Sequence, residues 1–363
     1  MDWLLERQGR IEKKLAKRHL KEGDMVLYDL TSSYFEGVKC PLAKMGKSRD
    51  RKRNTLQVNY GLVTDRNGCP VSVSVFEGNT GDPTTLMEQA KKARDDFGIG
   101  ELVMVGDRGM ITQKQIDELK KVDGMGWITA LKTGAIRKLM DGAALQLDLF
   151  DERGLFELTH EDFPGERLVA CRNPSLARKH AYKRESMIEA ALDGIYVIRT
   201  SVQKKKMDAD ETVRNYKNLT NVERAFRSLK SIDLMVRPIR HRTEDRVRSH
   251  IFLSMLAYYV QRYMMEALRP LLFADEDQEA KLTRDPVAPA KRSFQSLEKV
   301  HTKTLSDGTA AHSFKTLLHH MSTITKDKCV QKIDGTNDNT FNIDTKPNPK
   351  QQKVYELLSK ITV

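Results

Sequence analysis

The spacing of apolar and polar residues along the first third of the chain predicts a mixed α/β fold, with helices flanking a sheet. Short apolar runs separated by turn residues favour an antiparallel meander of three strands at residues 25–29, 56–63 and 70–76. Apolar runs and helical spacing then alternate, and the expected elements are helix 82–97, strand 102–105, helix 112–122 and strand 127–131. Asp82 is expected as the N-cap of the first of these helices, because Pro83 follows it at a position that suits the first turn.

The pattern changes twice in the second half of the chain. Residues 133–205 are expected to form a small β-containing insertion, with strands 156–159, 167–171 and 194–200 and a basic helix at 175–191. Residues 211–230 have the spacing of one strongly amphipathic helix. Residues 246–268 are helical and apolar on most faces, as expected for a helix within the core. From residue 271 the composition turns polar, and residues 326–351 are expected to be loose.

These changes divide the chain into five predicted parts. They are an N-terminal helix (1–24), the first part of the α/β core (25–132), the insertion (133–205), the core helices (206–270) and a polar helical tail (271–363). The N-terminal helix begins without a preceding capping sequence, as if upstream residues had been lost.

Composition excludes several classes of protein. The 363 residues include 62 Lys and Arg against 50 Asp and Glu, which gives a formal net charge of +12. With 39% hydrophobic and 31% charged residues, the chain is too apolar for a disordered protein and too charged for a membrane bundle. The four cysteines lie far apart without zinc-type spacing, so neither a disulfide scaffold nor a structural zinc site is expected. We expect a soluble, cytoplasmic protein that binds a polyanion and has no membrane partner.

Two aspartates lie at the ends of apolar strands. Asp29 closes the run at 25–29, and Asp107 follows the run at 102–105, with Gly106 before it and Gly109 shortly after. An acid at the end of a buried strand is unfavourable unless it is hydrogen-bonded or holds a cation. The glycines allow another backbone or a ligand to come close. The alternative for each aspartate alone is that it caps a turn.

A third acid, Glu223, lies in the amphipathic helix. Seven-residue spacing places Tyr216, Glu223 and Lys230 in one column, which borders the buried stripe at about 100° per residue. The stripe is expected to contain Leu219, Val222, Phe226 and Leu229. Arg227 follows Glu223 by one turn and flanks the column. The alternative is an exposed helix with ordinary ion pairs between successive turns.

Together the three acids indicate a site for metal-dependent phosphoryl transfer. Mg²⁺ prefers hard oxygen ligands, usually a few carboxylates with water and phosphate oxygens. Two such ions, for which Mn²⁺ is expected to substitute, would activate an attacking hydroxyl and stabilise the leaving oxygen. We therefore predict that Asp29, Asp107 and Glu223 are the catalytic residues and the ligands of Mg²⁺.

A basic loop at residues 44–53 is a candidate for contact with DNA. It contains no aromatic residue for stacking, so contact with phosphates is favoured over readout of bases. The candidate residues of this loop are Arg49, Arg51, Lys52 and Arg53. The alternative is a solvated charged loop. For Trp127, which lies in a predicted strand, packing in the core is favoured over stacking on a base.

The motifs around these acids resemble those of the DDE transposases of bacterial insertion sequences, in particular the IS-four-like group with a Tyr-Arg-Glu-Lys signature around the third acid. Tyr216, Glu223 and Lys230 match that signature. Leu219 stands at its Arg position, and the candidates for the missing basic role are Lys217, Arg224 and Arg227. Further blocks that look like the same group are residues 28–37, 76–80, 106–110 and 237–259.

The resemblance implies a ribonuclease H-like core, with Asp29 on the first strand, Asp107 after the fourth and Glu223 on a later helix. It also implies cut-and-paste transposition, in which a homodimer on paired ends cleaves double-stranded DNA at the transposon ends and joins it to target DNA. Besides the basic loop, the residues expected to contact DNA are Tyr216, Arg227, Lys230, Arg224 and Arg108.

Two departures from the family define the alternatives. Relatives carry a substantial DNA-end-binding region before the first acid, and here Asp29 comes almost at once. The basic helix also runs abruptly, after residue 186, into residues 190–194. A copy shortened at its N-terminus and internally is therefore expected. The alternatives to an active transposase are a DNA-binding remnant without catalysis and a nuclease of the same fold that never joins strands.

Overall fold

The computed structural model divides the chain into two units. The described residues are 1–50, 52, 54–173, 194–275, 283–288, 291–331 and 339–362. The first unit comprises Met1–Tyr259 with Arg284–Pro289, and the second comprises Val260–Thr283 with Ala290–Val363. The basic helix expected at 175–191 and the abrupt junction after residue 186 lie outside the described residues.

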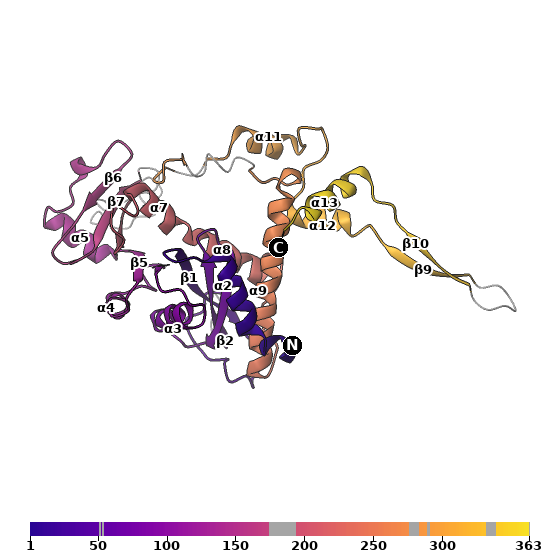
Figure 1. The fold of residues 1–363 in the computed structure, drawn as a ribbon, viewed down its shortest axis with the longest axis horizontal. Helices are drawn as coiled ribbons and strands as arrows, with labels where there is room; N and C mark the ends of the chain where they lie inside the picture. The colour runs from indigo at the N-terminus through magenta and orange to yellow at the C-terminus, as the bar shows by residue number, and fades with distance from the viewer. Residues whose placement is uncertain are drawn as a thin grey trace. The chain divides into compact units, whose positions relative to one another are not determined.

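The described part of the first unit is built on one sheet of eight strands in the order β3-β2-β1-β4-β5-β8-β7-β6 (Figure 1). The strands are β1 Met25–Tyr34, β2 Gln57–Asp65, β3 Pro70–Glu77, β4 Leu102–Val105, β5 Met125–Ala130, β6 Leu155–Leu158, β7 Arg167–Arg172 and β8 Ile195–Thr200. β1, β2 and β3 form the expected antiparallel meander, and β4 pairs parallel with both β1 and β5. The fold is the predicted ribonuclease H-like arrangement of a mixed sheet flanked by helices.

The insertion between the second and third acids extends this sheet. β8 pairs antiparallel with β5, β7 with β8, and β6 with β7, so the three predicted strands add to the edge of the core sheet. The insertion also contains the helix α5 (Thr133–Asp141) and the short 3₁₀ turn η1 (Leu147–Leu149). The apolar residues Ile136 and Leu139 of α5 pack with Leu168 and Val197 in a core of their own.

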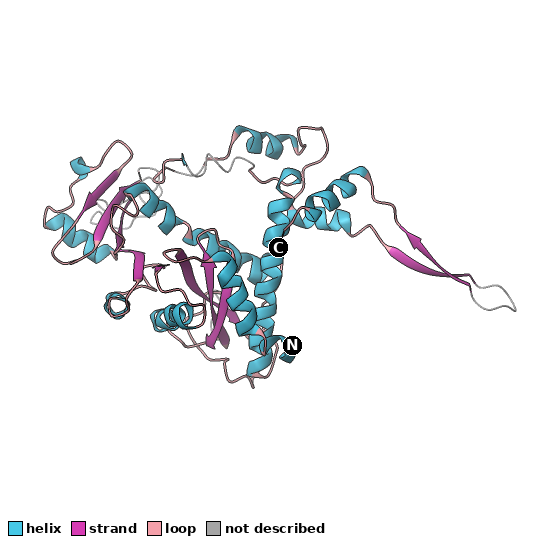
Figure 2. Cartoon of the chain, viewed as in Figure 1, coloured by secondary structure: helices cyan, strands magenta, loops and turns pink. Residues whose placement is uncertain are grey.

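Helices cover both faces of the core sheet (Figure 2). Successive side chains of a strand point to opposite faces, so the apolar residues of one strand pack against helices on both sides. The N-terminal and core helices are α1 Asp2–Leu5, α2 Gln8–His19, α3 Asp82–Asp95, α4 Gln113–Leu119, α7 Ala209–Lys217, α8 Leu219–Arg227 and α9 Glu244–Ala267. On β1, Leu27 packs in the apolar cluster that contains residues of α8 and α9. Its neighbour Tyr28 packs in the cluster that contains residues of α2, α3 and α4.

The spacing of residues 211–230 predicted one regular helix, and this prediction is wrong. The segment breaks at Asn218 between α7 and α8, and it continues after α8 as a π-helical turn, η3 (Ser228–Ile232). The turn of the π-helix contains more residues than that of an α-helix, so it rotates later side chains out of the expected column. Lys230, which lies in this turn, is buried, whereas Glu223 before it is exposed and Tyr216 is partly buried.

The second unit has its own small core. Its described elements are the end of α9, the 3₁₀ turn η4 (Arg269–Leu271), α11 Phe294–Thr302, α12 Phe314–Met321, β9 Lys326–Gln331, β10 Asn339–Asp344 and α13 Pro349–Ser359. Leu271, Leu317 and Val354 are buried together. β9 and β10 form an antiparallel hairpin, so the prediction that residues 326–351 are loose is wrong for these strands. Among the described residues, no helix has the length and apolar character needed to cross a membrane.

Candidate functional site

Asp29 and Asp107 occupy equivalent positions on two adjacent parallel strands. β1 and β4 are paired Met25 to Val103 and Leu27 to Val105, a constant difference of 78 in residue number. The same difference separates Asp29 from Asp107, so the extension of this register places the two aspartates opposite each other. Asp29 lies within β1, whereas Asp107 follows the last residue of β4 by two positions. The parallel pairing therefore brings together two acids that are far apart in the sequence.

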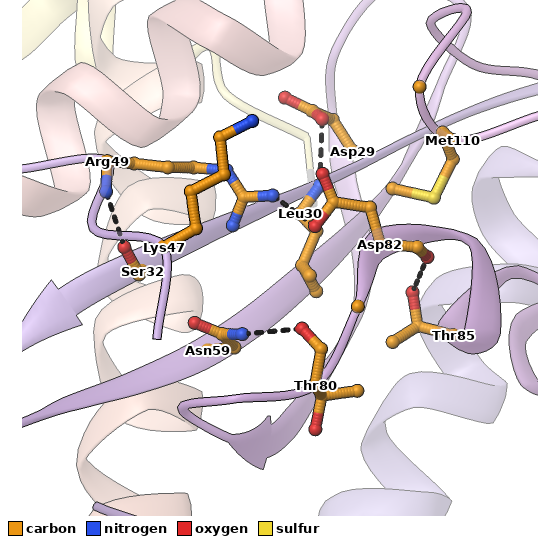
Figure 3. Close-up of polar contacts among 12 residues, drawn as sticks. Asp29, Leu30, Ser32, Lys47, Arg49, Asn59, Thr80, Asp82, Thr85 and Met110 are labelled. Carbon is orange, nitrogen blue, oxygen red and sulfur yellow. Dashed lines mark hydrogen bonds and ion pairs between the residues drawn. The ribbon is translucent and has the colours of Figure 1, made fainter. Parts of the chain in front are cut away.

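The environment of Asp29 disfavours its negative charge. Burial raises the pKa of Asp29 to about 7, and the nearby charges of Asp107 and Asp82 act in the same direction. A hydrogen bond from Leu30 N to Asp29 Oδ1, at 2.9 Å, and the positive charge of Arg49 partly oppose the rise (Figure 3). A partly buried carboxylate that other acids repel is the kind of group that a bound cation would stabilise.

Asp107 forms a turn cap as well as facing Asp29. Its Oδ1 accepts hydrogen bonds from Gly109 N at 2.9 Å and from Met110 N at 2.7 Å. The carboxylate is exposed at the end of β4. The turn-cap interpretation of this aspartate is therefore confirmed, and the turn fixes one carboxylate oxygen.

Glu223 lies on the helix that covers the same face of the sheet. α8 contacts β1, and its buried residues Val222 and Phe226 share an apolar cluster with Leu27. Burial raises the pKa of Tyr216 to about 12, and the charges of Asp107 and Glu223 raise it as well. Tyr216 therefore lies within electrostatic range of the second and third acids.

The three acids do not converge on a common point in this structure. Within the described part of the chain, no group of three or more His, Cys, Asp or Glu side chains lies in an arrangement that could hold a metal ion. Asp107 acts electrostatically on Asp29, and Glu223 is an exposed residue of α8. The geometry thus brings together two carboxylates and leaves the third on a neighbouring helix.

Arg49 and Asp82 form a polar arrangement beside Asp29 that the sequence did not predict (Figure 3). The guanidinium of Arg49 forms an ion pair with the carboxylate of Asp82. Asp82 is not the N-cap of α3, as expected; Gly81 is the N-cap, and Asp82 lies in the first turn of the helix. The prediction failed because the Asp-Pro pair suits either position, and only the contact with Arg49 separates them.

Lys230 lies in a buried ion cluster. Its Nζ is 2.9 Å from Asp50 Oδ1, and Arg237 Nη1 is 2.5 Å from the same oxygen. Asp50 Oδ2 accepts a hydrogen bond from Tyr34 N at 3.0 Å. The Asp50 side chain is only 1% exposed, and that of Lys230 is 10% exposed. Lys230, expected to contact DNA phosphates, is thus occupied by an internal partner in this arrangement.

The other residues predicted to contact DNA differ in their surroundings. Arg108, Arg224 and Arg227 are exposed near the acids in sequence, on the turn after β4 and on α8. The Nζ of Lys52 lies 3.8 Å from the centroid of the Tyr34 ring. Arg51 and Arg53 lie outside the described residues.

The structure also places two further residues, Lys217 and Trp127, whose roles the sequence left open. Lys217, a candidate for the missing basic role, donates hydrogen bonds to the carbonyl oxygens of Pro286 and Val287. Trp127 is 4% exposed within the core, so the preference for core packing over base stacking is confirmed.

Sequence reasoning missed Asp50 and Asp82 as parts of the site. Asp50 stands as a single acid within a run of basic residues, which is a weak signal that it neutralises buried cations. Its partners Lys230 and Arg237 follow it by 180 and 187 residues, so no local pattern could identify them.

Comparisons with known proteins give a matching family and a similar solved structure. The model of a protein family described as the transposase DDE domain matches residues 24–260. Among solved structures, the chain is similar to the piggyBac transposase in a synaptic complex with hairpin DNA, with a TM-score of 0.43 and 10% sequence identity. The similarity covers 80% of this chain and 60% of that one, so the chain spans about three-fifths of the length of that transposase. A comparison with curated proteins finds no match.

Proposed function

Because the chain belongs to the family of transposases with a DDE domain, we propose that it cuts DNA at transposon ends and joins those ends to target DNA in a metal-dependent reaction. The observation that carries this proposal is the parallel pairing of β1 with β4. Its register, continued by two residues, would bring Asp29 opposite Asp107, and the charge of Asp107 acts on Asp29. A carboxylate pair at that position suits phosphoryl transfer better than it suits a simple turn.

The carboxylates fit divalent cations as hard oxygen ligands. Burial and the charge of Asp107 raise the pKa of Asp29, which is an electrostatic cost that a cation would offset. Asp29, Asp107 and Glu223 would hold Mg²⁺, or Mn²⁺ in its place. When bound, such ions lower the pKa of an attacking water and offset the charge on the leaving oxygen.

The remaining residues would bind and orient the DNA. The exposed guanidinium groups of Arg108, Arg224 and Arg227 would contact phosphates near the cleaved bond. Tyr216 stays protonated at neutral pH, because its pKa is raised to about 12, and its hydroxyl would donate a hydrogen bond to a phosphate oxygen. In this scheme hydrolysis frees a 3′-hydroxyl, which then attacks a phosphodiester of the target and displaces the target's 3′-oxygen, and the chain forms no covalent bond to DNA.

Finer features of the proposal come from the resemblance of the motifs. Tyr216 and Glu223 would serve the signature of the IS-four-like group, with Arg224 or Arg227 in place of its arginine. Lys217 is the weaker candidate for that role, because it binds backbone carbonyls of residues 286 and 287. A homodimer would hold the paired ends.

A cleavage assay tests the proposal. The purified protein is incubated with the DNA that flanks its own gene, in Mg²⁺, Mn²⁺ or EDTA, beside Glu223→Ala. Glu118→Ala is the matched control, because Glu118 is a partly exposed acid on α4, which packs on the other face of the sheet.

The proposal predicts metal-dependent cuts at defined ends for the wild type and the control, and none for Glu223→Ala. Binding without cleavage would contradict it and identify a DNA-binding remnant. Cleavage without joining of strands would identify a nuclease of the same fold.

A further inference from the structure

The segment Lys44–Asp50, here called the strap, is fixed at both ends. At its start, Lys44 pairs with Gln57 of β2 through two backbone hydrogen bonds of 3.1 and 3.0 Å. The Gln57 side chain also donates to the carbonyl oxygen of Lys47 at 3.3 Å. At its end, Arg49 N donates to Ser32 Oγ at 3.0 Å, and the Asp50 carboxylate accepts from Tyr34 N. The strap therefore follows the edge of the β1–β2 pair.

The cations that pair with Asp50 at the end of the strap follow Glu223 in the sequence. Asp50 binds Lys230, in the π-helical turn that follows α8, and Arg237, in the segment after it. Removal of one partner from a buried ion pair leaves an uncompensated charge, which is strongly unfavourable. The position of the strap is therefore coupled to the position of the helix that carries Glu223.

Arg49 is the strap residue that reaches the acids. It precedes Asp50 directly, its guanidinium pairs with Asp82, and its charge acts on Asp29 (Figure 3). Its side chain is 26% exposed, so solvent reaches it. Arginine binds phosphates with two parallel hydrogen bonds, and a phosphodiester that approaches Asp29 would find this guanidinium beside it.

We infer that Lys230 and Arg237 act through Asp50 as positioning residues, which hold the strap so that Arg49 meets the scissile phosphate beside Asp29. Arg49 is then a catalytic residue, and Asp82 is its partner before DNA binds. Lys230 contributes to catalysis without touching DNA. This inference rests on the proposed function, and it gives the buried lysine of the signature a role that differs from phosphate contact.

The test compares Lys230→Met, Asp50→Asn and the double variant with the wild type. The double variant has no unpaired charge at these two positions and remains informative if a single variant unfolds. Lys230→Arg tests rescue of the charge, and Lys114→Met, at an exposed lysine of α4, is the matched control. Three quantities are measured: the single-turnover cleavage rate, the salt dependence of DNA binding, and hydrogen exchange of the strap amides, including Arg49 N–H.

If the inference is correct, Lys230→Met and Asp50→Asn each slow cleavage by up to about a hundredfold, the effect of a misplaced group, and the double variant is no slower than either. Lys230→Arg retains most of the rate. Exchange of the strap amides rises in both single variants, and the salt slope of binding changes equally in Lys230→Met and Asp50→Asn, because both lose the same Arg49 contact with phosphate.

A direct phosphate contact predicts the opposite pattern. Lys230→Met would then lower the slope of log K against log salt by about 0.9 while Asp50→Asn would not lower it, and Lys230→Met would leave strap exchange unchanged and add to the effect of Asp50→Asn. Any of these results overturns the inference. If the wild type does not cleave DNA at all, the proposed function fails, whereas exchange and salt slope still decide whether Lys230 fixes the strap.

Discussion

At the scale of single residues, the site combines an unfavourable charge with polar partners that limit its cost. Asp29 lies in a sheet interior that raises its pKa to about 7, and Leu30 N and Arg49 oppose that rise. A protein that needed only stability would place an uncharged residue here. The unfavourable carboxylate is consistent with a role in binding cations.

Replacement of Asp29 by Asn should therefore stabilise the protein in a pH-dependent way. The pKa of Asp29 is raised in the folded state, so the folded protein binds a proton that the unfolded chain has lost between pH 3.8 and about 7. The wild type should lose stability across that range relative to Asp29→Asn, by a few kcal/mol at pH 8, since each unit of pKa is worth about 1.4 kcal/mol.

Urea unfolding of both proteins in EDTA, at pH 5 and at pH 8, measures this difference. An equal difference at both pH values would show that burial of the Asp29 charge is not the cause. Addition of Mg²⁺ at pH 8 should restore stability to the wild type and leave Asp29→Asn nearly unchanged.

Sequence alone singled out the acids that the local pattern of apolar residues marks. Asp29 and Asp107 stood out because each follows an apolar run, and parallel pairing then placed them together. Asp50 did not stand out, because its burial depends on partners 180 or more residues away. Long-range ion pairs leave no periodic pattern in a sequence.

At the scale of elements, the sequence predicted strands where apolar residues mark them. It underestimated the length of a strand where buried polar residues continue it. β1 extends to Tyr34, five residues beyond the predicted end, and the residues Thr31, Ser32 and Ser33 in this extension are polar. Ser32 Oγ accepts from Arg49 N, and Ser33 Oγ lies 2.9 Å from Tyr60 OH. These buried hydroxyls are satisfied by partners from other elements, which no spacing rule predicts.

The close packing of β1 against β2 and α3 predicts that a larger residue at Gly61 destabilises the protein. A Cβ added at Gly61 of β2 would lie 2.3 Å from the hydroxyl of Tyr28, which is buried and donates to Thr85 Oγ1 at 2.8 Å. Gly61→Ala should lower the free energy of unfolding by about 1–3 kcal/mol through overpacking.

Gly9→Ala is the matched control for this change, because a Cβ at this position of α2 meets no atom within 4 Å. It should be neutral or stabilise the helix by up to about 1 kcal/mol. Thermal unfolding followed by circular dichroism compares the two variants, and equal stability would contradict the packing argument.

At the scale of the whole molecule, the chain leaves the first unit and returns to it. Residues 284–288 lie in the first unit, where Val287 is 2% exposed in the core cluster that also contains residues of α8. Arg214 Nη2 donates to the carbonyl oxygen of Arg284 at 3.1 Å, and Asn173 Nδ2 donates to that of Val287 at 2.9 Å. The polar composition of the surrounding segment concealed this apolar anchor.

Loss of the anchor should destabilise the first unit. Val287→Ala removes two buried methyl groups, which corresponds to roughly 2 kcal/mol of unfolding free energy, whereas Val38→Ala, at a residue 86% exposed, should change it little. Urea unfolding of both variants measures the difference. Equal stability of the two would mean that the returning segment contributes nothing to the core.

The central claim is that Asp29, Asp107 and Glu223 together perform metal-dependent joining of DNA. The most direct test supplies DNA ends that are already cut, with free 3′-hydroxyls, together with a target plasmid and Mg²⁺ or Mn²⁺. Wild-type protein should join the two DNAs, and Asp29→Asn, Asp107→Asn and Glu223→Gln should each bind DNA but yield no joined product. Joining at the wild-type rate by Asp107→Asn or Glu223→Gln would contradict the claim.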